Sequence, residues 1–446
     1  MNWSYFKASV CVLKKTTRLL TLSLMVTTTT ALANELSIDT ISLSNAIQRT
    51  LANNPQLSVF DYKYKSLEGE LITAGLKPEY SVGAELENFA GTGEVSGLSN
   101  SEMTLTISSV IEFGDKVNSR KRLVNSQKQA LTVDKKIQTL GILGEVTKRY
   151  IDVLTLQQIM LVNKNAEKLA QQTYQTVSKR VRVGSTPSSE LKRAEAALAL
   201  ARLETLTITK QFKASLRKLA IMWGEQSPRF SRVSGDLFAF PKVNSLDYIM
   251  EQLSQSPHIM AYAEQSRIQQ AQLQQSKTQN YADISWSAGI KRFEGSNDTA
   301  LVAGFSMPLF TENRNKGSYQ SQKAKLDEIE QQKQSSIRAI YSQLTSLFSA
   351  QEEAQLRVES LRSYIIPPQE KALELVQQGY SEGRFSYLEL ISSQEELIEM
   401  QYALIFSASE IHKQIASIEA LSGIPLISSY FPSKADAQLS NIIENY

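Results

Sequence analysis

The sequence predicts a mainly α-helical protein with a small β part, built from two internal repeats that contain long helical hairpins. Three observations indicate this fold. The 446 residues include 19 glycines and 11 prolines, and so few helix breakers favour long helices. A glycine-containing helix break occurs twice, at Gly184 and Gly383, 199 residues apart. Four stretches alternate apolar and polar side chains, as β-strands do.

Residues 1–33 are typical of a secretory signal peptide. Four basic residues and no acidic one precede the apolar run LLTLSLMV, and Ala31-Leu32-Ala33 suits cleavage before Asn34. The apolar run is too short to anchor the chain in a bilayer. Cys11, the one cysteine of the sequence, would be removed with this segment, so we expect no disulfide and no thiolate site. Beyond residue 33 no run of 18 apolar residues occurs, and we expect no transmembrane helix.

The charge of the chain indicates no nucleic-acid partner. Its 48 Lys and Arg residues against 45 Asp and Glu residues give a net charge of +3, and four of the basic residues belong to the first 33. No basic patch of the kind that nucleic-acid-binding domains carry follows.

The rest of the chain divides into two repeats of one plan, which we place at residues 34–240 and 241–424, followed by a C-terminal tail at 425–446. After each break, apolar or small residues recur at spacings of three and four, at 191–222 and 390–421. This period indicates a coiled-coil seam. An amphipathic helix on a globular core is the alternative, which the matching register of the two repeats disfavours.

Each repeat also contains a pair of expected strands. They cover residues 80–89, 103–113, 284–293 and 300–310. One face of each is apolar and the other polar, which is typical of transmembrane β-strands, although two hairpins on a soluble core would alternate in the same way. Because lipid does not permit open sheet edges, and closed membrane barrels need about eight strands or more, four strands per chain require oligomerisation.

Long helices are expected to follow both strand pairs. Residues 115–183 contain no proline, and a continuous helix of this length would span ~100 Å at about 1.5 Å per residue. The matching stretch at 316–379 contains Pro367-Pro368, so we expect a break or kink there.

Taken in order, these segments resemble the TolC family of outer-membrane efflux proteins. The resemblance rests on SLSNAIQRTLANNPQL (42–57) and its copy at 245–259, on 183–224 and 382–423, and on GFSMPLFTENRNKG (304–317). Six residues of the last segment are similar to the CzcC-like branch, which serves heavy-metal cation pumps: Pro308, Leu309, Phe310, Asn313, Asn315 and Gly317.

The resemblance implies a homotrimer in the outer membrane of a Gram-negative bacterium. Each chain would give four strands to a 12-stranded barrel in outer-membrane lipid and two helical hairpins to an α-barrel across the periplasm. The trimer would be a passive exit duct with a periplasmic adaptor and an inner-membrane pump of the resistance-nodulation-division type as partners. It would have no catalytic residues, no cofactor and no resident metal.

The resemblance places the two hairpin tips at about residues 180–189 and 379–388. There the adaptor would dock, and Pro187 would suit the first turn of the returning helix. The expected docking residues are Val183, Gly184, Ser185, Thr186, Pro187, Gly383, Arg384, Phe385 and Ser386.

The family narrows its closed end with a ring of acidic side chains, and the first of these positions matches Glu389. The second matches Ser392, so the double ring of the family is incomplete here. A family arginine matches Phe385, with Arg384 adjacent. Glu190 occupies the equivalent place in the first repeat. Three symmetry-related carboxylates near an axis would attract cations; the alternative for Glu389 is an acid in the first turn of a helix, favoured by the helix dipole.

No catalytic motif accompanies these features, and we expect His412 to lie on a helix surface.

Alternatives within the same fold are a type I protein-secretion duct and a multidrug exit duct. A periplasmic coiled-coil adaptor or structural protein is an alternative of another class, disfavoured by the two hairpins and two strand pairs. An exported enzyme has no supporting set of residues.

Overall fold

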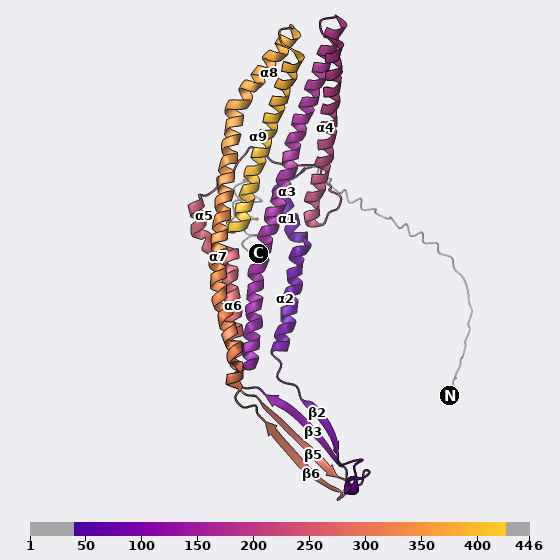
Figure 1. Cartoon of the computed structure of the whole chain (residues 1–446), viewed down its shortest axis with the longest axis vertical. Coiled ribbons are helices and arrows are strands. Elements are labelled where there is room, and N and C mark those ends of the chain that lie inside the picture. The colour runs from indigo at the N-terminus through magenta and orange to yellow at the C-terminus, as the bar shows by residue number, and fades with distance from the viewer. Residues whose placement is uncertain (1–39, 425–446) are drawn as a thin grey trace, which may run out of the picture. The chain divides into compact units, whose positions relative to one another are not determined.

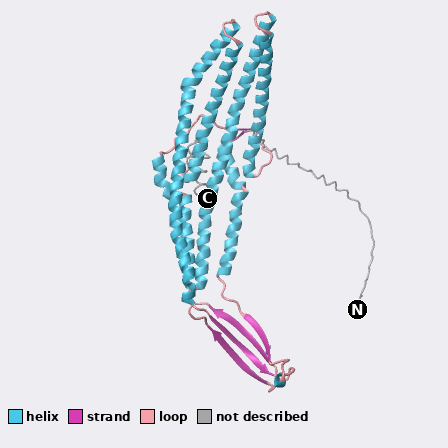
Figure 2. Cartoon of the chain, viewed as in Figure 1, coloured by secondary structure: helices cyan, strands magenta, loops and turns pink. Residues whose placement is uncertain are grey.

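The computed structural model describes residues 40–424. The expected signal peptide at 1–33 and the tail at 425–446 lie outside the described residues. The described residues belong to one compact unit. Within it, helices run side by side and a β-sheet lies at one end of them (Figures 1 and 2), so the predicted mainly α fold with a small β part is confirmed.

The first repeat consists of a short strand, two helices, a strand pair and a helical hairpin. In chain order these are β1 (Thr40–Ile41), α1 (Leu43–Asn53), α2 (Pro55–Ala74), β2 (Ser81–Glu87), β3 (Glu102–Ile111), α3 (Lys116–Arg182) and α4 (Ser188–Ala220).

The second repeat follows the same plan. Its elements are β4 (Arg232–Val233), α5 (Leu246–Gln252), α6 (Pro257–Thr278), β5 (Ile284–Phe293), β6 (Asp298–Ser306), α7 (Thr311–Ser360), α8 (Ile366–Ser381) and α9 (Tyr387–Ser422).

The first helices of the two repeats begin with the same cap. The hydroxyl of Ser42 accepts a hydrogen bond from the Asn45 amide at 3.2 Å, and that of Ser245 accepts one from the Tyr248 amide at 3.3 Å. A serine oxygen in this position satisfies one of the free amides at a helix N-terminus. A proline then opens the next helix in both repeats, as its fixed φ favours.

Four antiparallel strands form one sheet in the order β2-β3-β5-β6. The strand expected at 300–310 instead begins at Asp298 and ends at Ser306. Pro308 explains the earlier end, because proline has no amide to donate to a strand ladder. Within the described residues, β2 and β6 each have one strand partner and form the edges of the sheet.

The pairing register places all the large apolar side chains of the strands but three, Val110, Phe293 and Val302, on one face. Ile107 lies opposite Val82, and Leu105 lies between Ala84 and Ile290. Gly289 lets β5 approach the backbone of β3 closely, because a Cβ at this position would lie 2.2 Å from the Leu105 carbonyl oxygen. A side chain on Gly289 would therefore push the two strands apart.

The chain turns from sheet to helix through the same backbone geometry in both repeats. Asp115, before α3, has φ 64° and ψ 32°, and Phe310, before α7, has φ 63° and ψ 32°. This left-handed region is uncommon for residues other than glycine. Its recurrence shows that both corners redirect the chain by the same turn.

The helix α3 is continuous over 67 residues, which corresponds to ~100 Å at about 1.5 Å per residue. Its counterpart is interrupted where the proline pair predicts. A π-helical turn at Leu361–Ile365 joins α7 to α8, and Pro367-Pro368 follow in the first turn of α8. Proline removes a helical hydrogen bond and crowds the preceding turn, and the wider turn accommodates both effects.

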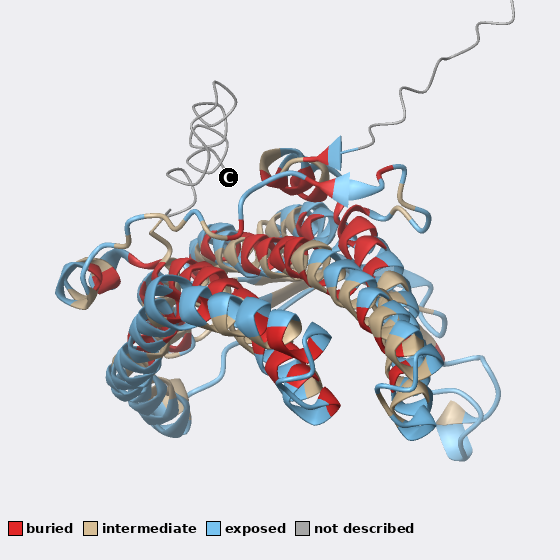
Figure 3. Ribbon diagram, turned by 90° about the horizontal axis from the view of Figure 1, so that it is seen from above, coloured by how far each residue is buried: buried red, intermediate tan, exposed pale blue. Residues whose placement is uncertain are grey.

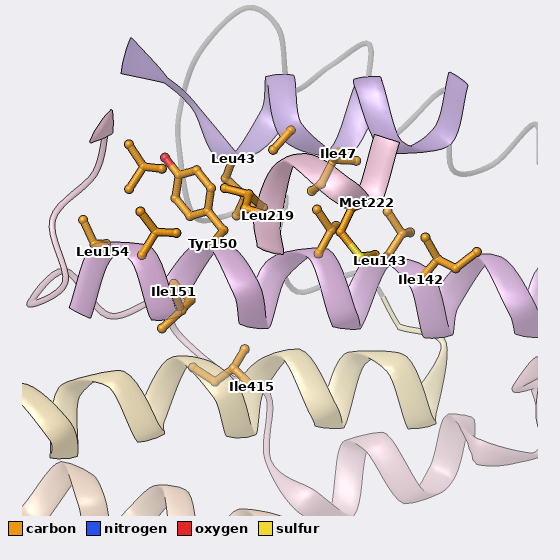
Figure 4. Packing of buried hydrophobic residues seen from close by; sticks show 14 of the residues in the cluster. Leu43, Ile47, Ile142, Leu143, Tyr150, Ile151, Leu154, Leu219, Met222 and Ile415 are labelled. Carbon is orange, nitrogen blue, oxygen red and sulfur yellow. The ribbon is translucent and has the colours of Figure 1, made fainter. Parts of the chain in front are cut away.

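A hydrophobic core holds the repeats together where α1, α3 and α9 meet (Figure 4). Tyr150 of α3 is fully buried in it, and its hydroxyl donates to the carbonyl oxygens of Ile41 and Ser234, next to the paired strands β1 and β4. Burial raises the pKa of Tyr150 to about 12. Viewed from above, buried residues gather where the helices face one another (Figure 3).

None of the helices within residues 40–424 combines the length and the apolar character that crossing a membrane requires.

The expectation that His412 lies on a helix surface is wrong. Its side chain is buried on α9, where Nε2 donates to the Leu237 carbonyl oxygen at 2.8 Å and the ring lies 5.3 Å from that of Phe240. The segment between β4 and α5 packs over this face of α9, a long-range contact that the periodicity of α9 alone does not reveal.

We expect His412 to make folding stability depend on pH. Burial lowers the pKa of His412 below its ordinary 6.5, against the opposing effects of the Leu237 carbonyl and Asp236. The unfolded chain therefore binds the proton more tightly. The contribution of neutral His412 to the free energy of unfolding is complete above about pH 6.5 and is lost as the pH falls through the lower, folded-state pKa.

Thermal unfolding of the detergent-solubilised protein at about pH 7.5 and pH 5 measures this effect. We expect His412→Gln, whose amide can still donate to Leu237, to lower Tm at the higher pH but to lose fewer degrees on acidification than the wild type. Equal losses in both proteins would contradict the assignment.

Candidate functional site

The two helical hairpins end at the same end of the described unit, away from the sheet (Figure 1). We call the loop between α3 and α4, residues 183–187, the first tip, and the loop between α8 and α9, residues 382–386, the second tip. Gly184 and Gly383 have φ of +76° and +80°, which glycine adopts without strain.

The same hydrogen bonds close both tips. The Gly184 amide donates to the Val181 carbonyl at 3.0 Å, and the Gly383 amide donates to the Tyr380 carbonyl at 3.1 Å. In each tip the next amide donates to the carbonyl five residues before it, at 2.9 Å and 2.7 Å. This is the Schellman ending of a helix, with glycine at its left-handed position. The repeated sequence break is thus a repeated backbone structure.

The predicted docking residues lie at the surface of these two tips. Thr186 is half-buried and the other eight are exposed, Val183 to 75%. Pro187 precedes the first turn of α4 at the N-cap position, one residue before the predicted place. Phe385 lies against Gly379 of α8, where an added Cβ would be 2.3 Å from the ring. Glycine at 379 therefore lets the aromatic ring pack on the helix.

Glu389 forms a capping box at the start of α9. Its Oε2 accepts hydrogen bonds from the Ser386 amide at 2.7 Å and the Ser386 hydroxyl at 2.8 Å, and its own amide donates to that hydroxyl. These bonds lower the pKa of the Glu389 carboxyl below its ordinary value. The exposed, ionised side chain thus satisfies the Ser386 amide, and the Ser386 hydroxyl satisfies the Glu389 amide.

Glu190 makes a different contact because Pro187 stands where Ser386 stands in the second tip. Without a capping serine, the Glu190 carboxylate accepts a hydrogen bond from the Tyr380 hydroxyl at 3.1 Å. Arg180 also reaches Tyr380: it donates to the Tyr380 carbonyl and lies 4.7 Å from the centre of the ring. The ends of α3 and α4 therefore contact the end of α8 through Tyr380. Burial and Glu190 raise the pKa of Tyr380 to about 12.

Sequence reasoning missed Arg180 and Tyr380 as a contact between hairpins. Their positions next to the two helix breaks were visible, but no local pattern pairs residues 200 positions apart. Arg384, a predicted aperture residue, is exposed and forms an ion pair with Glu382 of its own loop. The structure therefore brings Glu190 to the other hairpin, while Glu389 and Arg384 contact residues of their own tip.

The apolar face of the sheet is exposed. Val82, Leu301 and Phe305 have exposed fractions of 80%, 86% and 87%, and their register places them on one face. A contiguous apolar patch of this kind marks a surface that contacts lipid or another protein.

No group of three or more His, Cys, Asp or Glu side chains in residues 40–424 could hold a metal ion.

Residues 46–225 match the protein family described as outer membrane efflux protein. Residues 46–225 therefore form a domain of this family. The chain is an outer-membrane efflux channel and not an enzyme. The matched residues cover most of the first repeat, and the second repeat has the same elements in the same order.

Relatives of the chain extend the match beyond the first repeat. The cobalt-zinc-cadmium resistance protein CzcC of Cupriavidus metallidurans is 21% identical over 383 residues, which cover 86% of this chain and 90% of the relative.

Solved structures of outer-membrane proteins share the fold. VceC of Vibrio cholerae has a TM-score of 0.67 at 20% identity, covering 85% of this chain and 96% of that protein. The CmeC outer membrane channel of Campylobacter jejuni has a TM-score of 0.69 at 15% identity, covering 90% and 89%. The outer membrane efflux fold is therefore preserved at low sequence identity.

We expect Glu389→Gln to lower the cation selectivity of the channel in planar bilayers by roughly twofold, as the loss of one charge per chain from a narrow aperture predicts. Glutamine keeps an acceptor for the Ser386 amide, so the helix start should survive and the effect should report the charge.

Ser386→Ala is the matched control. It keeps the Glu389 charge but removes the cap at a cost of ~1 kcal/mol, so hydrogen exchange in the first turn of α9 should rise while selectivity stays the same. An unchanged selectivity of Glu389→Gln would remove Glu389 from the aperture and leave helix capping as its role.

Proposed function

We propose that three copies of this chain form the exit duct of a tripartite efflux system, which carries divalent heavy-metal cations out through the outer membrane. Its partners are a periplasmic adaptor and an inner-membrane pump of the resistance-nodulation-division type. The observation that carries the proposal is the pairing of two features in one chain. An open sheet with an exposed apolar face lies at one end, and two hairpin tips of matching structure lie at the other.

The sheet supports the trimer. Amides and carbonyls on the outer edges of β2 and β6 have no partner within the four described strands, and each such group would cost several kcal/mol in lipid. Pairing β6 of one copy with β2 of the next satisfies both edges at once. Three copies then give a closed barrel of twelve strands, within the range of membrane barrels, whose apolar face contacts outer-membrane lipid.

The tips support docking of an adaptor. Both are exposed loops on rigid helices, closed by the same Schellman bonds, so in a trimer six similar knobs would surround the opening. Val183 and Phe385 offer apolar contacts, and Arg384 offers a charged one beside them. A preorganised surface of this kind suits protein recognition, because little ordering is lost on binding.

The relative CzcC, a cobalt-zinc-cadmium resistance protein by name, supports heavy-metal cations as the cargo.

A susceptibility panel on a strain that lacks this chain tests the cargo. We expect increased sensitivity to zinc, cobalt or cadmium, restored by the wild-type chain, and unchanged sensitivity to dyes, detergents and antibiotics. Sensitivity confined to organic compounds would contradict metal cargo and favour a multidrug duct. Loss of a secreted polypeptide without any change in sensitivity would favour a type I secretion duct.

A further inference from the structure

The charged side chains on the polar face of the sheet are confined to its loop end. The register identifies two rows across the four strands next to the hairpin loops. The outer row is Glu87, Glu102, Phe293 and Asp298, and the second row is Glu85, Thr104, Lys291 and Ala300. The rest of this face carries uncharged residues, most of them serine, threonine, glycine or alanine.

Lys291 is the one cationic side chain on the polar face of these four described strands. Its Nζ lies 2.8 Å from Oε2 of Glu87 and also forms an ion pair with Glu102. The Lys291 side chain is 20% exposed, so the ammonium is held between the two carboxylates. Asn88 fixes Glu102 further by donating a hydrogen bond to its Oε1 at 2.9 Å.

The Lys291 ammonium reduces the repulsion between the two carboxylates. Glu87 and Glu102 are direct cross-strand partners, and like charges in that position repel each other. With Lys291 present, the rows hold four carboxylates and one ammonium per chain. Without Lys291, the same narrow ring would hold four uncompensated carboxylates per chain, and its negative potential would rise.

We propose that Lys291 is a selectivity-determining residue of the channel exit, where its ammonium offsets the field of Glu87 and Glu102 and limits how strongly the exit prefers cations. This inference rests on the proposed function, in which three sheets close into a barrel with their polar faces toward the lumen. In a duct that carries cations, the carboxylates attract the cargo, and the lysine weakens this attraction so that the exit does not retain the cargo.

Neighbouring Arg292 provides a matched control. It follows Lys291 on β5, lies on the opposite, apolar face opposite Met103, and pairs with Glu294 at 3.9 Å. Arg292→Gln therefore removes the same charge from the same strand, but on the lipid side of the barrel wall.

The experiment measures reversal potentials of purified channels in planar bilayers under a potassium chloride gradient near 0.1 M, where the screening length is about 10 Å. We expect Lys291→Gln to raise the potassium-to-chloride permeability ratio roughly twofold or more. Lys291→Arg and Arg292→Gln should keep the wild-type ratio. The double variant Lys291→Gln with Glu102→Gln restores the net charge and should return the ratio to the wild-type value.

A conducting Lys291→Gln channel with the wild-type ratio would overturn the inference. If Lys291→Gln does not assemble, Glu102→Gln decides: it leaves Lys291 paired with Glu87, and should lower the ratio, whereas an unchanged ratio would overturn the inference. A wild-type chain that forms no conducting pore would overturn the proposed function itself, and the inference with it.

Discussion

A sheet with an exposed apolar face and two unpaired edges is the constraint on which the rest of this molecule depends. Lipid can cover the apolar face, but it cannot satisfy the edge amides and carbonyls. Four strands are too few to close on themselves, so the edges of β2 and β6 require other copies of the chain. In the proposed trimer, closure would make the helices leave the sheet as a ring and would bring the tips together around an opening.

Much of the fold could be predicted because its signals are local or repeated. The helix breaks at Gly184 and Gly383 predict the Schellman turns, since glycine has access to the left-handed backbone that they need. Pro367-Pro368 marks the interruption between α7 and α8. Alternation identifies all four strands, but the last one ends before Pro308, whose missing amide is also a local signal.

The candidate site was less predictable because its contacts join distant segments. Tyr380 of the second hairpin accepts a hydrogen bond from Arg180 and donates one to Glu190, and both of these partners belong to the first hairpin. The segment around Leu237 covers His412. Periodicity identifies which face of a helix is apolar but not what packs on it. The role of Glu389 in capping can be predicted from the sequence, because Ser386 lies three residues before it and completes the capping-box pattern.

Counting the chains in the detergent-extracted protein by native mass spectrometry tests the closed sheet most directly. We predict complexes of three chains, extracted only with detergent, that dissociate when β2 or β6 is altered so that its edge can no longer pair. Gly289→Val, which separates β3 from β5 inside one sheet, should also prevent assembly. A folded single chain that stays in the outer membrane would contradict the shared barrel.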